Sequence, residues 1–207
     1  MSEISRQSSL ITPEEYLAGE LISKIKHEYL GGIVHAMAGA RNVHNDISGN
    51  IFAAFHARLR GKKCRPYNSD TKVRLSMPSG QQRFYYPDVQ VACELNSPDD
   101  TFQDKPVILV EVISPSTRRT DEVEKLAAYT TISTLDAYWI VESKLRQVTV
   151  HQRSGKFFEK FVFQVASDLL HIPSMKLEIS LAEVYENVIF PPLSDYEQEE
   201  AELRLVE

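Results

Sequence analysis

Two carboxylates lie in apolar, β-type segments of the chain where a charge is unexpected. Asp88 follows Pro87 within the segment 85–92, and Glu111 lies in the run 107–113, whose other residues are all apolar. A run that is apolar on both faces of an extended chain is typical of a strand in the middle of a sheet. An ionised carboxylate there is costly unless something compensates its charge. A divalent cation shared by Asp88 and Glu111 would do so, because Mg²⁺ prefers hard oxygen ligands.

A lysine completes this pattern further along the chain. Lys125 lies in a predicted helix that Thr120 can cap, shortly after the Glu111 segment. A helix that follows a strand by a short loop can place its lysine above the two carboxylates, and Tyr129 would share the same helical face. Acid, acid and lysine in this order suggest a metal-dependent phosphodiesterase site. The simpler alternative is a surface ion pair between Lys125 and Asp121, four residues earlier.

Five further polar residues are candidates for the same cleft. Glu28 and His44 can be outer metal ligands, proton relays or only satisfied polar groups. Asp70 and Lys72 alternate onto one face of a predicted strand and could line the cleft. Ser114 follows the second carboxylate segment directly.

Other classes of enzyme fit less well. The sequence has no GxSxG, P-loop, HExxH or Rossmann glycine motif. A glycosidase needs two acids at a defined separation, but that mechanism gives Lys125 no role.

The composition is that of one globular domain. The chain has 207 residues, of which 43% are apolar and 25% charged. We expect a domain over residues 1–193 and an acidic tail over 194–207. No apolar run approaches the length of a membrane span, and the N-terminal segment does not resemble a secretory signal. Cys64 and Cys93 are isolated in the sequence, which indicates a reducing, cytoplasmic setting.

The net charge of −6 is unevenly distributed. The tail over 194–207 has six acids and one arginine, so it carries −5 and the body about −1. A nearly neutral body can present a basic face to nucleic acid, although a cluster of basic residues can equally be a solvated helix end. The basic residues gathered near position 60 are Arg58, Arg60, Lys62, Lys63 and Arg65.

Periodicity and turn residues predict an α/β (α+β) fold with a central mixed sheet. Thr12, Pro13 and Glu15 have the pattern of a capping box at the start of a helix that runs to about residue 26. Adjacent glycines predict a hairpin over 28–37. Further helices are expected over 42–61, 120–132 and 181–185, and strands over 71–75, 85–92, 107–113, 137–141, 147–151 and 157–163.

The chain resembles the Uma-type restriction endonuclease family of the PD-(D/E)XK nuclease superfamily. The resemblance extends over most of residues 12–190 and is carried by HEYLGGIVHAMAG, HNDISGNIFAAF, SDTKVRL, YYPDVQVAC, VILVEVISPSTRRTDEVEKLAAY and AYWIVE. It implies a mixed αβββαβ core in which Asp88 is the acid of the PD element and Glu111 the second acid. The lysine expected two positions after that acid is Ile113 here, and Lys125 can replace it.

The resemblance also implies a mechanism and partners. Asp88, Glu111 and the Val112 carbonyl would bind Mg²⁺ or Mn²⁺, and Lys125 would orient or deprotonate the attacking water. We expect the two carboxylates to approach within roughly 4–6 Å, given metal–oxygen distances near 2.1 Å. The substrate would be DNA. Apart from the resemblance, the charge of the acidic tail suggests that it contacts a second subunit of a homodimer or repels non-specific nucleic acid. The alternative is a catalytically inactive nuclease fold that binds nucleic acid or regulates another protein.

Overall fold

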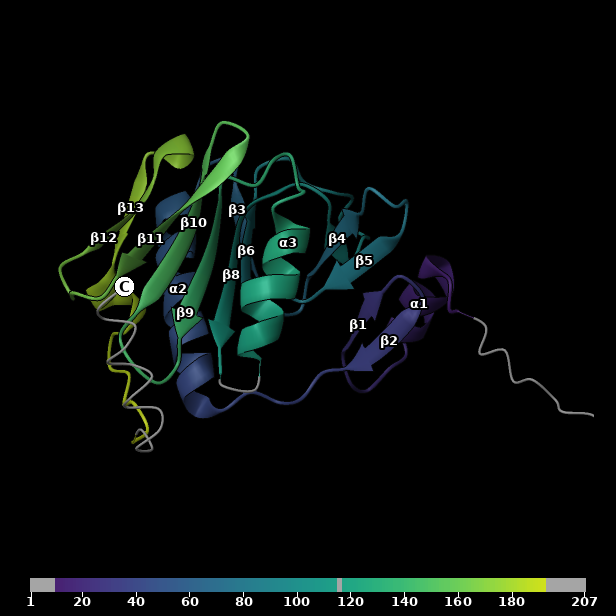
Figure 1. The fold of residues 1–207 in the computed structure, drawn as a ribbon, viewed down its shortest axis with the longest axis horizontal. Helices are drawn as coiled ribbons and strands as arrows, with labels where there is room; N and C mark the ends of the chain where they lie inside the picture. Colours follow the sequence, from purple (N-terminus) through teal and green to yellow (C-terminus); the bar gives the residue numbers. More distant parts are fainter. Residues whose placement is uncertain (1–9, 115–116, 193–207) are drawn as a thin grey trace, which may run out of the picture.

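A six-stranded mixed sheet forms the centre of the fold (Figure 1). The computed structural model describes residues 10–114 and 117–192. The acidic tail and the boundary at residue 193 lie outside these residues and stay predictions. In spatial order the strands are β11 (Phe157–Phe163), β10 (Val148–Ser154), β9 (Ala137–Glu142), β8 (Pro106–Ile113), β6 (Val89–Ala92) and β3 (Arg65–Asn68).

Strand β8 lies inside this sheet because both of its faces are apolar. It pairs antiparallel with β6 and parallel with β9. A parallel pair needs a crossover connection, and the chain makes it through the helical segment 120–129. Alternate residues of β8 belong to two core clusters, Val110 to one and Leu109 and Ile113 to the other. Glu111 shares the face of Leu109 and Ile113.

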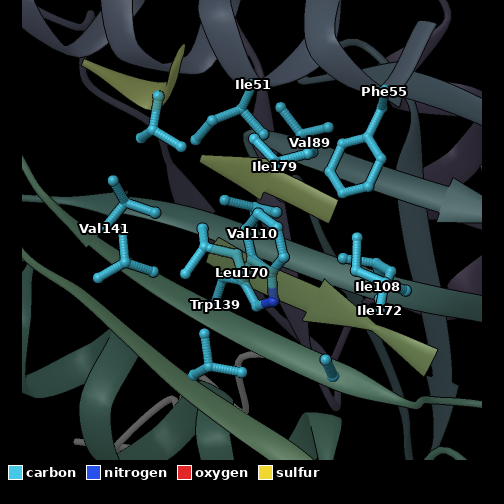
Figure 2. Packing of buried hydrophobic residues seen from close by; sticks show 14 of the residues in the cluster. Ile51, Phe55, Val89, Ile108, Val110, Trp139, Val141, Leu170, Ile172 and Ile179 are labelled. Atoms are coloured by element: carbon cyan, nitrogen blue, oxygen red, sulfur yellow. The ribbon is translucent and has the colours of Figure 1, made fainter. Parts of the chain in front are cut away.

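Helix α2 (Asn42–Leu59) covers one face of the sheet. Its Ile47, Ile51 and Phe55 recur at helical spacing and are fully buried. The rings of Phe55 and Trp139 lie 5.5 Å apart between centroids, and Figure 2 shows Ile51 and Phe55 above the sheet. Burying each such side chain stabilises the fold by about 1.5–3 kcal/mol. This packing also fixes the first turn of α2, which carries His44.

The crossover segment covers the opposite face. It begins as a π-helix, η1 (Thr120–Lys125), and continues as α3 (Leu126–Tyr129). The predicted cap at Thr120 is wrong, because the N-cap is Arg119 and no side-chain hydrogen bond caps the segment. The helix also ends three residues before the expected position 132. Short π-helical segments are often found at functional sites.

A five-stranded sheet packs against α3 from the other side. Val73, Leu75 and Tyr85 of this sheet share one core with Leu109 and Ala128, so α3 lies between the two sheets (Figure 1). In spatial order its strands are β2 (Ile33–Ala36), β1 (His27–Leu30), β5 (Gln82–Tyr85), β4 (Lys72–Ser76) and β7 (Phe102–Gln103).

The first helix, α1 (Pro13–Glu20), begins with the predicted capping box between Thr12 and Glu15. It was expected to reach residue 26 but ends at Glu20. Leu21 and Ile22, which follow the helix, have no core to pack against and are exposed, so tertiary packing would not stabilise a further turn.

The C-terminal part of the domain packs on α2. Strands β12 (Leu169–Ile172) and β13 (Leu177–Ser180) form a two-stranded sheet joined through η2 (Pro173–Met175). Figure 2 shows residues of both strands in the same apolar cluster as α2. The short helix α4 (Leu181–Val184) follows and contacts α2.

The expectation of two isolated cysteines is wrong. Strands β3 and β6 pair antiparallel with Arg65 opposite Ala92. This pairing brings the flanking Cys64 and Cys93 together, and they form a disulfide. The two cysteines therefore no longer support a reducing setting. Within residues 10–114 and 117–192, no helix combines the length and apolar character needed to cross a membrane.

The hairpin predicted from adjacent glycines is present between β1 and β2. Gly31 has a φ of 60° and Gly32 a φ of 110°, values that favour glycine. The turn matters for the site because β1 carries Glu28 toward the crossover segment.

Candidate active site

Asp88 lies one residue before β6, and Glu111 lies on the neighbouring strand β8. Val89 pairs with Val110 at the end of the β6–β8 ladder. Continuing this antiparallel register by one residue sets Asp88 opposite Glu111. Directly opposed residues share a face of the sheet, with Cβ atoms about 4.5–5.5 Å apart in a regular ladder. We therefore expect both acids on the face that the crossover segment covers, and the separation of roughly 4–6 Å between them stays a prediction.

Both oxygens of the Asp88 carboxylate are hydrogen-bonded. The backbone N–H of Val112 donates to Oδ2 at 2.7 Å, and His44 Nε2 lies 2.8 Å from Oδ1. Burial by itself lowers the pKa of the His44 imidazole, but the hydrogen bond and the charge of Asp88 outweigh it and raise this pKa overall. His44 comes from the first turn of α2, so helix and sheet meet at Asp88.

Glu111 is held by two residues of the crossover segment. Its Oε1 accepts hydrogen bonds from Lys125 Nζ at 3.0 Å and from the Tyr129 hydroxyl at 2.8 Å. Lys125 and Tyr129 are four residues apart and therefore lie on one side of the helical segment. All three side chains are buried. The carboxylate that is buried in the sheet is thus met by a cation and a hydroxyl donor.

Lys125 contacts three carboxylates at once. Its Nζ lies 3.0 Å from Glu111, 3.2 Å from Glu28 and 3.3 Å from Asp121. The ammonium points to Glu111, as expected. Lys125 and Asp121 also form an ion pair, but this pair does not lie on the surface. Asp121 is itself only 3% exposed, so this pair belongs to the buried cluster. The i,i+4 spacing of Asp121 and Lys125 indicates an ion pair, but it does not distinguish a buried pair from one on the surface.

The cluster carries an excess of negative charge. Burial raises the pKa of Glu111 and of Asp121, and the neighbouring carboxylates raise them further. Burial alone would lower the pKa of Lys125, but the charges of Glu111, Glu28 and Asp121 raise it well above its usual value. Asp88 adds a fourth acid that raises the Glu111 pKa. The repulsion among these carboxylates would be relieved by a proton or by a further cation.

The site offers hard oxygen donors of the type that bind a divalent ion. Within residues 10–114 and 117–192, no three His, Cys, Asp or Glu side chains converge well enough to hold a metal by themselves. Mg²⁺, however, usually takes one or two carboxylates and completes its shell with other oxygens. Asp88, Glu111 and the Val112 carbonyl are oxygen donors of the kind that Mg²⁺ prefers, and the expected metal site stays a prediction.

The other predicted cleft residues divide into two groups. Glu28 joins the cluster through Lys125. Asp70 instead pairs with Lys26 at 2.6 Å on the surface. Lys72 is buried and donates to the Tyr86 hydroxyl at 3.2 Å, and no carboxylate in the described part of the chain lies within an ion-pair distance of its Nζ. These contacts do not link Asp70 or Lys72 to Asp88 or Glu111, so their place in the cleft stays a prediction.

Ser114, just after β8, and Arg118, just before the crossover segment, are both held by hydrogen bonds. The Ser114 amide donates to Thr117 Oγ1 at 3.1 Å. Arg118 donates to both carboxylate oxygens of Glu142, at 2.6 and 2.7 Å, and Glu142 pairs with Ile113 across the strands. A bidentate pair of this kind fixes geometry as well as charge. The sequence did not reveal the role of Arg118, because its partner Glu142 lies on β9, 24 residues later in the chain.

The basic cluster near position 60 lies far from the carboxylates. It follows the C-terminal end of α2, whereas His44 lies in the first turn. Fourteen residues of helix separate His44 from Arg58, which corresponds to about 21 Å. Arg58 pairs with Glu183 at 2.6 Å. The simpler interpretation, a solvated helix end, therefore fits these residues.

Comparisons with known proteins show the family and the fold. The family described as "Uma2: Putative restriction endonuclease" matches residues 13–182. Two similar proteins of Synechocystis sp. (strain PCC 6803) are named uncharacterized. The protein slr1290 is 31% identical over 87% of this chain and 94% of its own length, and sll1609 is 26% identical over 72% and 84%.

A solved structure has the same fold. It is described as a "putative nuclease belonging to DUF820" from Anabaena variabilis, and it superimposes with a TM-score of 0.64 over 81% of this chain and 93% of its own. Its sequence is 16% identical, so the likeness concerns the fold. The family match spans most of the domain, including Asp88, Glu111 and Lys125. The chain therefore belongs to the Uma2 family, whose description is "Putative restriction endonuclease".

Proposed function

We propose that this protein is a metal-dependent endonuclease of the PD-(D/E)XK type that hydrolyses phosphodiester bonds in DNA. The observations that support the proposal are the hydrogen bond that ties the Asp88 carboxylate to Val112, the neighbour of Glu111, and the bond from Lys125 to Glu111. Two acids and a lysine are the groups that this chemistry requires. A purely structural ion pair between Lys125 and Glu111 would not need a second acid beside the strand that carries Glu111.

The metal would be held by Asp88, Glu111 and the Val112 carbonyl. When bound, Mg²⁺ or Mn²⁺ supplies a Lewis acid that polarises the scissile phosphate and makes water a better nucleophile. The protein supplies orientation. Tyr129 and Lys125 both donate to Glu111 Oε1, so this carboxylate cannot rotate freely.

Lys125 would contribute charge rather than accept a proton. Its pKa lies well above the usual value because three carboxylates surround it, so the ammonium is protonated at neutral pH. A protonated lysine can orient the attacking water and offset the charge that develops on the phosphate. The alternative role considered from the sequence, deprotonation of the water, is therefore disfavoured in the metal-free site.

The test is cleavage of supercoiled plasmid DNA with Mg²⁺, with Mn²⁺ and with EDTA. We expect nicking that requires the metal and that Asp88→Asn or Glu111→Gln lowers by about 100-fold or more, a size typical of lost electrostatic stabilisation at a reacting phosphate. Glu159→Gln, the same change on the exposed strand β11, is the matched control and should cleave like the wild type. Circular dichroism checks that each variant is folded.

The inactive alternative makes a different prediction. A nuclease fold that only binds nucleic acid would retard DNA in a gel without cutting it, and Asp88→Asn would bind equally well. Cleavage that persists in Asp88→Asn would instead come from a contaminating nuclease, and the proposal would then have no support.

A further inference from the structure

His44 lies where it can control the direction of the Asp88 carboxylate. Its Nε2 is 2.8 Å from Asp88 Oδ1, and both side chains are mostly buried. Three residues later on α2, Ile47 is fully buried against the sheet. The imidazole is therefore carried by a helical turn that cannot shift easily.

Asp88 needs such an external support. It lies one residue before β6 (Val89–Ala92), so the sheet ladder does not itself include it. On the β8 side a single backbone donor, the Val112 N–H, holds Oδ2. One hydrogen bond leaves a carboxylate free to pivot about that contact, whereas a second donor at Oδ1 removes this freedom.

The two donors leave other lone pairs of the Asp88 carboxylate free. An ionised carboxylate has about four lone-pair sites, of which His44 and Val112 each use one. Val112 is the neighbour of Glu111 on β8, so the Asp88 carboxylate is tied to the strand that carries the second acid. The main-chain carbonyl of Val112 also contributes to the environment of the imidazole, because its hydrogen bonding raises the His44 pKa.

We propose that His44 is a positioning residue, whose Nε2–H donor fixes the Asp88 carboxylate in the orientation needed to bind a divalent metal together with Glu111. This inference rests on the proposed function. His44 does not act on the substrate, and its effect passes entirely through Asp88.

The first experiment measures Mn²⁺ binding to the full chain by electron paramagnetic resonance, without DNA. His44→Leu, which has no donor, should weaken Mn²⁺ binding roughly 10- to 100-fold, the range found for hydrogen-bond partners of metal ligands. His44→Gln places an amide N–H near the position of Nε2 and should restore the affinity to within a few fold. His56→Leu, an exposed histidine further along α2, is the matched control and should bind like the wild type.

The second experiment needs no metal. The Val112 amide proton is hydrogen-bonded to Asp88, so its NMR shift and exchange rate report the position of the carboxylate. In His44→Leu the resonance should move and exchange faster, and in His44→Gln it should stay near its wild-type position. A merely structural role would lower the melting temperature in both variants alike.

The outcomes separate the two proposals. If the wild type binds no Mn²⁺ at millimolar concentration, the proposed function fails, while the Val112 amide still tests whether His44 orients Asp88. If the wild type binds Mn²⁺ and His44→Leu binds equally or more tightly, His44 is not a positioning residue. An unchanged Val112 amide in His44→Leu would overturn the inference as well.

Discussion

Replacing Lys125 with methionine should destabilise the protein strongly at neutral pH. Methionine has a similar length but no charge, so Lys125→Met leaves Glu111, Glu28 and Asp121 without their shared cation. Breaking a buried ion pair by removing one partner typically costs about 3–5 kcal/mol. For a domain of this size, that corresponds to a fall in melting temperature of roughly 6–20 °C.

The loss should depend on pH in a defined direction. Burial raises the pKa of Glu111 and Asp121 above their usual 4.5 and 3.8, while the charge of Lys125 lowers both. Without Lys125 both pKa values rise further. A carboxyl group whose pKa is raised on folding holds its proton more tightly in the folded state, so its stability contribution is lost as pH rises. Lys125→Met should therefore lose most above pH 7 and recover toward pH 5.

Urea unfolding followed by circular dichroism at pH 5 and pH 7.5 measures both effects. Lys105→Met is the control, because this exposed lysine also pairs with a glutamate and should have no measurable effect. The double variant Lys125→Met with Glu111→Gln should be more stable than Lys125→Met alone, because one of the stranded carboxylates is neutral. A loss below about 1 kcal/mol, the size expected of a surface pair, and equal at both pH values, would refute the reasoning.

Three further changes test the packing around the site. Tyr129→Phe should cost about 1–3 kcal/mol in urea unfolding, because it deprives the buried Glu111 of a donor, and an unchanged midpoint would contradict that bond. Reducing the Cys64–Cys93 disulfide, which links residues 29 positions apart, should lower the free energy of unfolding by roughly 3–4 kcal/mol. Melting curves that coincide with and without reductant would show that the disulfide does not stabilise the fold. Phe55→Ala should cost about 3–5 kcal/mol in the same assay, and a smaller loss would mean that α2 packs more loosely on the sheet.

Strands β8 to β11 of the central sheet could be placed from the sequence because their pattern has one interpretation. The single strand predicted over 85–92 is wrong, because β5 ends at Tyr85 in one sheet and β6 begins at Val89 in the other. A seven-residue run that is apolar on both faces has to be buried, and Glu111 within it requires a compensating partner. The glycine turn of the hairpin and the capping box of α1 are equally local signals. Each depends on contacts between residues a few positions apart, which the sequence displays directly.

Asp121 and the disulfide could not be placed in this way. An aspartate four residues before a lysine has the same spacing on a surface helix and in a buried cluster, and only the packing of α3 between two sheets distinguishes them. Cys64 and Cys93 meet because β3 pairs with β6, which no spacing between cysteines reveals. Glu28 reaches Lys125 from the second sheet for the same reason. These contacts are set by tertiary structure.

A buried charge cluster stabilises a core less well than apolar packing often would, so these residues are expected to serve a function. Lys125 joins Glu28 of one sheet to Glu111 of the other, and well-packed apolar side chains at these positions would often stabilise a core as much or more. The cluster also holds more acids than cations, so part of its repulsion is relieved only by a proton or a bound cation. Groups arranged at the expense of stability are expected at functional sites. The same excess of negative charge that weakens the metal-free fold would provide the affinity for a divalent ion.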